Sequence, residues 1–235
     1  MIRLESPISI GDVAMLTGSH TAKYIRRGRH HRVCESVAHR RDGSVICRMT
    51  ATETVGYRIA EYADSGDVPE SWATSLPHID GVVPANSPIA GPSERILPED
   101  AILAPIRRFV SMEQSVLFSG FPFSWAQPPQ AVRDGLHTSP SIAHAAGFEQ
   151  PVIQGLLSCG HLFALLHQQF GDRIHSGTEL ALWFISPVLV NTTLTSQARS
   201  CGQVDSPAGP VQQLAVWTRD DAGDLATVGY ARVRA

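Results

Sequence analysis

One segment constrains the fold of this chain most strongly. Residues 154–170 predict a helix that is apolar on nearly every side. Its apolar residues are Leu156, Leu157, Cys159, Leu162, Phe163, Ala164, Leu165, Leu166 and Phe170. A helix with almost no polar face must be buried on most sides. Gly171 and Asp172 then favour an end to the helix. The rest of the chain must therefore supply a cover for one central helix.

The residues after this helix predict antiparallel strands. Strand patterns cover residues 179–186 and 192–200. A terminal hairpin follows, in which residues 211–219 and 225–233 flank the turn at residues 220–224. One buried helix followed by antiparallel strands is typical of an α+β fold in which a sheet wraps around the helix.

The N-terminal part predicts a second hairpin and a long connection. Residues 32–54 form the hairpin, with Asp42 and Gly43 at its turn. Residues 61–105 are rich in Pro, Gly, Ser and Asp, which favours a connection without regular structure. We expect a hairpin region (1–60), this connection, and one complete domain (106–235). The two hairpins resemble each other in plan, so residues 1–60 either are a truncated copy of the later domain or match it by chance.

Composition narrows the classes of function. The net charge of −3 over 235 residues gives no whole-chain case for nucleic-acid binding. The four cysteines include no Cys-x-x-Cys pair, which favours free thiols over disulfides or zinc. No signal peptide and no window approaching ~18 apolar residues is evident, so we expect a cytoplasmic protein without a membrane span. The histidines show no ligand spacing with Asp, Glu or Cys, and we expect no metal.

The motif that points to chemistry begins at a histidine. The run Leu136-His137-Thr138-Ser139-Pro140 precedes Ala145-Ala146-Gly147-Phe148 and Pro151-Val152-Ile153-Gln154-Gly155-Leu156-Leu157. This spacing resembles the MaoC-like branch of the hot-dog fold, which comprises (R)-specific enoyl-thioester hydratases and 3-hydroxyacyl-thioester dehydratases. The resemblance covers roughly residues 109–235. It implies an antiparallel sheet wrapped around a long central helix, with residues 1–60 as a partial N-terminal extension.

The resemblance also implies roles for particular residues. His137 matches the family's acid/base histidine, and a neutral imidazole suits that task. Gly155 matches the family glycine whose backbone N–H holds the thioester oxygen as negative charge develops on it. The family aspartate position is occupied by Val132. The nearest carboxylate is Asp134, which is either the catalytic partner of His137 or a turn residue before Gly135.

Further residues are candidates for contact with substrate. Gln154 stands where many relatives have histidine, and it either contacts the thioester or begins the helix. Ser158 either lines the pocket or packs, while Trp183 and Phe184 belong to a segment that helps line the family's acyl pocket. His161 and His167 are expected to be satisfied core or dimer-contact histidines.

The expected function is hydration of a 2-enoyl thioester or dehydration of a 3-hydroxyacyl thioester, carried on CoA or an acyl carrier protein. We expect no cofactor, and a homodimer or a heterodimer with a related hot-dog chain. Three alternatives stay open. The pocket could isomerise or cyclise a polyketide-like acyl chain. The chain could be a non-catalytic subunit of a heteromeric dehydratase. A thioesterase is weaker, because no carboxylate lies between Gln154 and Gly160.

Overall fold

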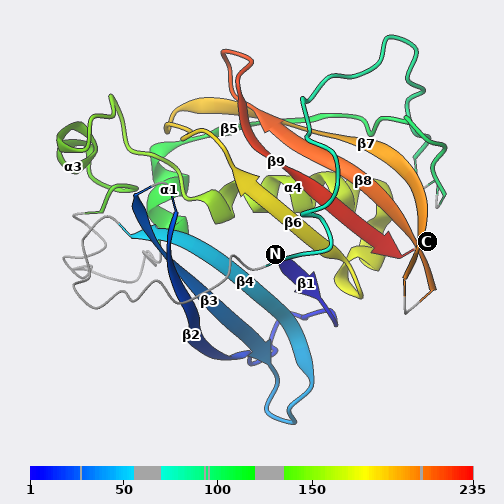
Figure 1. Ribbon diagram of the computed structural model, residues 1–235, viewed down its shortest axis with the longest axis horizontal. Coiled ribbons are helices and arrows are strands. Elements are labelled where there is room, and N and C mark those ends of the chain that lie inside the picture. Colours follow the sequence, from blue (N-terminus) through cyan, green and yellow to red (C-terminus); the bar gives the residue numbers. More distant parts are fainter. Residues whose placement is uncertain are drawn as a thin grey trace.

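A computed structural model describes residues 1–26, 28–55, 70–92, 94, 96–119, 135–206 and 209–234. Nine strands of this part form one antiparallel sheet in the order β2-β3-β4-β1-β6-β9-β8-β7-β5 (Figure 1). The strands are β1 (Ile2–Leu4), β2 (Met15–Arg26), β3 (Arg29–His39), β4 (Val45–Val55), β5 (Ile106–Val110), β6 (Glu179–Phe184), β7 (Thr192–Ser206), β8 (Gly209–Arg219) and β9 (Leu225–Arg234). The helices are α1 (Met112–Phe118), α3 (Pro140–Ala145), α4 (Gly155–Phe170) and the 3₁₀ turn η1 (Gly171–His175).

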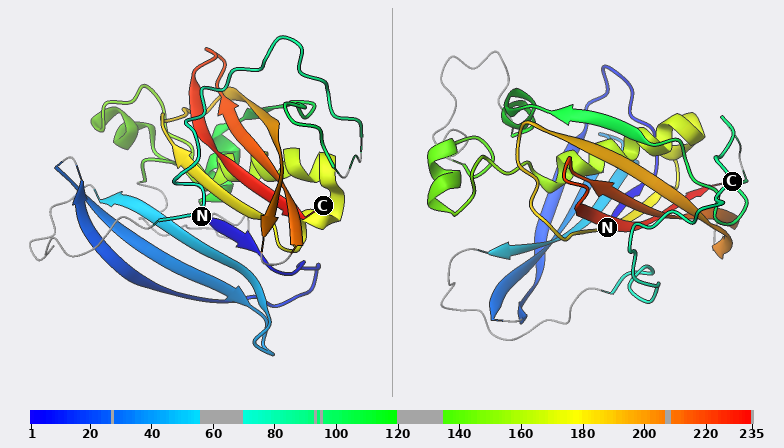
Figure 2. Two further views of the ribbon diagram at one scale, coloured as in Figure 1. Left: turned by 45° about the vertical axis from the view of Figure 1, so that its right-hand side comes forward. Right: turned by 90° about the horizontal axis from the view of Figure 1, so that it is seen from above.

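The predicted central helix is α4, and the C-terminal half of the sheet wraps around it (Figures 1 and 2). Leu162, Leu165 and Leu166 are fully buried in a cluster that strands β6 to β9 complete. Burying these leucines stabilises the fold through the hydrophobic effect. Gln154 is the N-cap, so the helix starts one residue later than predicted. The arrangement is the hot-dog fold that the sequence predicted.

Both predicted hairpins are confirmed. β3 pairs with β4 across a turn in which Gly43 has a φ of 87°. β8 pairs with β9 across a turn in which Gly223 has a φ of 86°. Glycine adopts this left-handed backbone at little cost, so a glycine marks each of the two turns in the sequence. Strands β1, β2 and β5 and the helices α1 and α3 were not predicted.

The described part of the 61–105 connection has no helix or extended strand, as predicted, yet it is closely packed. Trp72 lies under the guanidinium of Arg232, whose central carbon is 3.9 Å from the ring centroid. The Tyr230 hydroxyl donates to the Pro77 carbonyl oxygen at 2.8 Å. The connection crosses the face of β8 and β9 that points away from α4 (Figure 1). Both faces of these two strands are therefore covered, which holds the sheet beside α4 in one geometry.

The N-terminal strands extend the same sheet but are far less buried. β1 links the two halves, since Ile2 pairs with Met49 of β4 and with Leu180 of β6. β2 lies at the outer edge and is exposed along most of its length. Among the described residues, no helix has the length and apolar character needed to cross a membrane.

Candidate active site

His137 is held in place from two sides. Its Nδ1 lies 2.6 Å from the carbonyl oxygen of Val152. Its own carbonyl oxygen accepts a hydrogen bond of 2.9 Å from the hydroxyl of Ser115, a fully buried residue of α1. The side chain itself is only partly buried. These contacts fix both the backbone and the ring while leaving the imidazole within reach of a ligand.

The contact with Val152 also decides the tautomer of His137. A carbonyl oxygen can only accept, so Nδ1 must carry the hydrogen. In the neutral ring, Nε2 then holds the free lone pair and can take up a proton. His137 thus has the tautomer that a general base working through Nε2 requires.

The segment after α3 brings His137 to the start of α4. The Val152 N–H donates to the Leu136 carbonyl at 3.2 Å, and the Ile153 N–H donates to the Val188 carbonyl at 2.8 Å. These bonds tie residues 151–153 to the histidine loop on one side and to the chain after β6 on the other. Gly155, the first residue of α4, follows immediately.

The first turn of α4 offers backbone N–H groups. Gln154 is the N-cap, but its side chain makes no capping hydrogen bond. Its amide instead donates to the hydroxyl of Ser119, just beyond α1, at 2.8 Å. The first N–H groups of a helix have no acceptor within the helix and carry the positive end of its dipole. The start of α4 is therefore chemically suited to hold an oxygen that gains negative charge.

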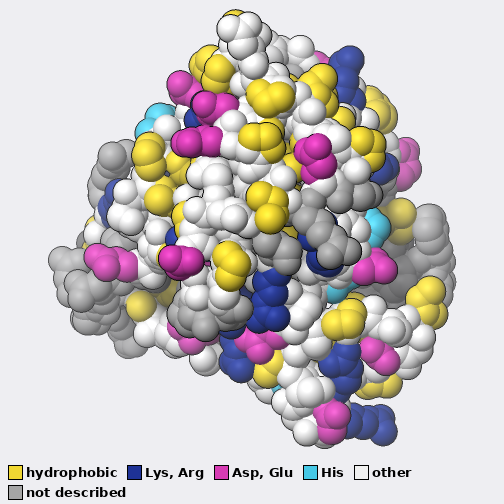
Figure 3. All heavy atoms as spheres, turned by 90° about the vertical axis from the view of Figure 1, so that its right-hand side faces the viewer, with side chains coloured by type: hydrophobic (Ala, Val, Ile, Leu, Met, Phe, Trp, Pro, Cys, Tyr) yellow, Lys and Arg dark blue, Asp and Glu magenta, His cyan; other side chains and the backbone are white. Residues whose placement is uncertain are grey.

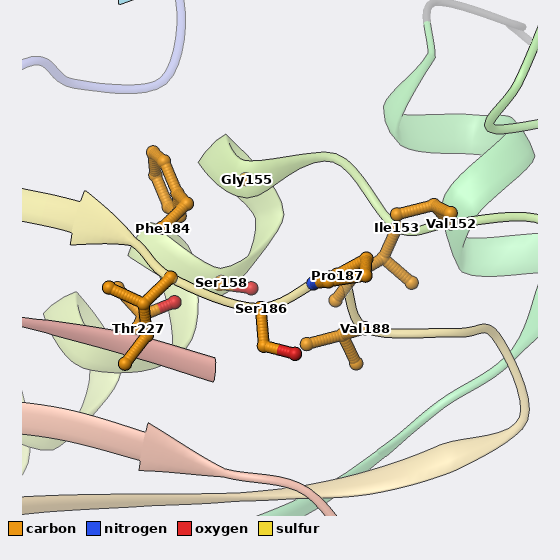
Figure 4. A pocket seen from close by; sticks show the side chains of 10 residues that line it. Val152, Ile153, Gly155, Ser158, Phe184, Ser186, Pro187, Val188 and Thr227 are labelled. Carbon is orange, nitrogen blue, oxygen red and sulfur yellow. The ribbon is translucent and has the colours of Figure 1, made fainter. Parts of the chain in front are cut away.

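A pocket of about 270 Å³ opens at this helix start (Figure 4). Its lining residues are Val152, Ile153, Gly155, Ser158, Phe184, Ile185, Ser186, Pro187, Val188 and Thr227. The lining is mostly apolar, with three hydroxyl groups. His137 is not part of the lining, and it reaches the pocket wall through Val152.

The Phe184 ring lies over Gly155. A Cβ placed on Gly155 would come within 2.9 Å of that ring, closer than real Cβ contacts. Figure 4 shows the ring beside the first turn of the helix. Phe184 is about half exposed, so the ring can move aside more readily than a core residue. The absence of a side chain at position 155 is thus what lets Phe184 pack against the helix start.

The predicted substrate-contact residues divide into two groups. Ser158 and Phe184 line the pocket, whereas Gln154 and Trp183 do not. Gln154 is turned to Ser119, and Trp183 is partly exposed elsewhere on β6. Asp134 and Val132 lie outside the described residues.

Sequence reasoning missed Thr227 of β9, which is nearly fully buried at the pocket wall. Its strand was predicted, but strand periodicity does not show which threonine will face a cavity.

For the two histidines on α4, a satisfied place in the core does not fit, and a dimer contact stays a prediction. His167 is about half exposed instead of lying in the core. His161 is buried, but its Nδ1 has no hydrogen-bond partner among the described residues, so it is not satisfied. Burial, with a smaller effect of the nearby Arg108, lowers the pKa of His161. The fold also brings His167, Asp172 and His175 together, a grouping that was not predicted from the sequence.

Comparisons with known proteins agree with the fold. Residues 134–213 match the family model described as a MaoC like domain. No curated protein matches the chain. A solved MaoC-like dehydratase superposes with a TM-score of 0.65 at 13% identity, covering 99% of this chain and 73% of the other. A MaoC-like dehydratase from Phytophthora capsici gives a TM-score of 0.64 at 15% identity, covering 100% and 66%.

A third solved structure is much longer than this chain. The peroxisomal multifunctional enzyme type 2 from Drosophila melanogaster gives a TM-score of 0.60 at 16% identity and matches 99% of this chain, which spans 36% of the length of that enzyme. At these identities the superpositions show a shared fold. Residues 134–213 thus match the model of the MaoC like domain, and the superpositions show that the chain has the hot-dog fold of these structures, with the sheet wrapped around α4.

Proposed function

We propose that this protein hydrates 2-enoyl thioesters, or in reverse dehydrates 3-hydroxyacyl thioesters. The observation that carries the proposal is the contact between His137 Nδ1 and the carbonyl of Val152, a pocket-lining residue, because it leaves Nε2 as the basic nitrogen of the ring. The start of α4 at Gly155 supplies backbone donors on that same pocket. A positioned base and an oxyanion donor are the two elements this addition requires.

In the hydration direction, Nε2 of His137 takes a proton from water as the water oxygen attacks C3 of the enoyl group. The electron pair of the double bond moves towards the thioester and forms an enolate. The Gly155 N–H stabilises the enolate oxygen, aided by the helix dipole. The imidazolium then returns a proton to C2. One water is added across the double bond, and the histidine ends as it began.

The acyl chain would occupy the mainly apolar pocket, with the hydroxyl groups of Ser158 and Thr227 on its wall. Asp134 is the proposed partner that shares the water with His137, on the strength of its sequence position. The thioester is carried on CoA or a carrier protein, and the protein acts as a dimer of its own chain or with a related one.

The test is loss of the conjugated enoyl absorbance when the purified protein is mixed with crotonyl-CoA and with a longer enoyl-CoA. We expect hydration by the wild type and a loss of about 10²- to 10⁴-fold in kcat/KM for His137→Ala. His20→Ala is a matched control, since His20 is an exposed histidine of β2. It should keep the wild-type rate.

Asp134→Asn tests whether Asp134 is the catalytic partner of His137 or only a turn residue. A loss comparable to that of His137→Ala would support Asp134 as the carboxylate partner. Hydration that is unchanged in this variant would remove Asp134 from the mechanism. A folded wild type that turns over neither thioester would contradict the proposal, in favour of an isomerase, a cyclase or a non-catalytic subunit.

A further inference from the structure

Three potential metal ligands meet at the far end of α4. His167 lies in the last turn of the helix, and Asp172 and His175 follow in η1. The Nε2 atoms of His167 and His175 lie 3.4 Å and 4.0 Å from the same oxygen, Oδ1 of Asp172. All three ligand atoms lie within 4.8 Å of one another. The two imidazoles therefore point at one carboxylate oxygen from different directions.

These separations are close to those of a metal site. Zinc bonds of about 2.0–2.2 Å in a tetrahedron place neighbouring ligand atoms about 3.4 Å apart. The two rings are tilted by 51°, with centroids 5.8 Å apart, so they are not stacked on each other. Small side-chain rotations would bring all three ligands onto one ion, because the three side chains are partly or largely exposed.

Local charge also favours a cation at this position. The C-terminal end of a helix carries the negative end of its dipole, and Asp172 adds a formal negative charge. Two arginine side chains, Arg173 and Arg108, also lie nearby and carry positive charge. Arg173 is directed back to the helix, where its Nε donates to the Phe170 carbonyl at 3.1 Å. Arg108 lines a hollow of about 450 Å³ that His167 and His175 also line.

The hollow indicates where the coordination sphere stays open. Three protein ligands leave at least one position of a zinc-like ion free. That position would be filled by water or by a small anion, which the guanidinium of Arg108 would favour. The side chains of His167, Asp172 and His175 are 52%, 96% and 39% exposed, so an ion can enter from solvent. Figure 3 shows a face of the molecule on which histidine, acidic and basic side chains reach the surface.

We propose that His167, Asp172 and His175 bind a divalent transition metal ion of the zinc class. Two imidazoles and one carboxylate suit zinc, cobalt or nickel and not magnesium or calcium, which prefer oxygen ligands. His167 lies about 18 Å along α4 from Gly155, so the site is separate from the proposed catalytic site. Bound metal would clamp η1 to the end of the central helix and stabilise the fold.

The alternative is that the two histidines merely pair with an exposed aspartate, a contact that contributes little to stability. Titration of untagged, chelator-treated protein with Co²⁺ separates the two possibilities. We expect one equivalent to bind with a visible d–d absorption spectrum and to be displaced by Zn²⁺. His167→Ala, Asp172→Ala and His175→Ala should each weaken binding by about 100-fold or more. His20→Ala should bind like wild type.

A second readout guards against misfolded variants. Zn²⁺ should raise the thermal midpoint of wild type and of His20→Ala but not that of His175→Ala. All metal-free proteins should melt at similar temperatures, because the altered side chains are outside the core. Co²⁺ binding that is absent at millimolar concentration, or that survives all three substitutions, would overturn the proposal.

Discussion

The two ends of α4 differ in the chemical groups that they present. At the N-terminal end, Gly155 is overlaid by Phe184 and the next turn presents the buried Ser158 to an apolar pocket. At the C-terminal end, polar side chains of His167 and Asp172 reach solvent. The first end offers backbone donors at the positive pole of the helix, and the second offers side-chain ligands at the negative pole. One buried helix thus holds two chemically opposite surfaces at a fixed separation.

The largest effect is expected at Gly155, at the N-terminal end of α4. Gly155→Ala places a Cβ within 2.9 Å of the Phe184 ring, so the ring must move and the substrate oxygen can no longer approach the N–H closely. We expect kcat/KM for enoyl-CoA hydration to fall about 10- to 100-fold with little change in stability. A wild-type rate would show that the helix start does not hold the thioester.

Phe184 offers a rescue of that variant. Removing the ring in Gly155→Ala/Phe184→Ala frees the space that the new methyl group needs. We expect kcat/KM of the double variant to be about 10-fold higher than that of Gly155→Ala. A double-mutant cycle with both single variants measures this coupling. Strictly additive losses would mean that the contact between these residues does not govern access to the pocket.

His161, which lies between the two ends of α4, should make the stability of the fold depend on pH. Burial and, to a lesser degree, Arg108 lower its pKa below the ordinary 6.5. The unfolded chain therefore takes up a proton more readily than the folded one as the pH falls. Stability should be full above about pH 6.5 and decline below it, towards the folded pKa. Urea unfolding between pH 5 and 8 measures the free energy of unfolding. This free energy should fall less with falling pH in His161→Leu than in wild type. An equal fall in both proteins would show that His161 does not cause the pH dependence.

The smallest effect is expected at Gly160, the other glycine of α4. A Cβ there meets no atom within 4 Å, in contrast to Gly155. Gly160→Ala should raise the free energy of unfolding by about 0.5–1 kcal/mol, because alanine loses less backbone entropy in a helix. Urea denaturation measures the change. Destabilisation would show that close packing extends further along α4 than the structure indicates.

The sequence predicted those features whose cause is local. The apolar content of residues 154–170 requires burial, and Asp-Gly or Gly at the hairpin turns permits a left-handed backbone. β2 was not predicted, because an exposed edge strand shows little alternation of polar and apolar residues. The end of the motif from His137 to Gly155 contributes Val152, Ile153 and Gly155 to the pocket wall, whereas His137 contacts that wall through Val152.

Other parts of the site depend on tertiary packing. Phe184 and Thr227 come from different strands and reach the start of α4 only through the register of the sheet. The cluster of His167, Asp172 and His175 forms because η1 turns the chain after Gly171, whose φ is 59°. The sequence indicated that the helix ends at Gly171, but not that the chain then turns so that His175 comes close to His167.

The most direct test of the proposed chemistry is the tautomer of His137 in solution. Nitrogen-15 NMR of histidine-labelled protein, assigned by comparison with His137→Ala, reports which ring nitrogen carries the hydrogen. The contact with the Val152 carbonyl predicts a neutral ring protonated at Nδ1, with Nε2 free to act as the base. A ring protonated at Nε2 would contradict the account, because the nitrogen needed to accept the proton from water would already hold one.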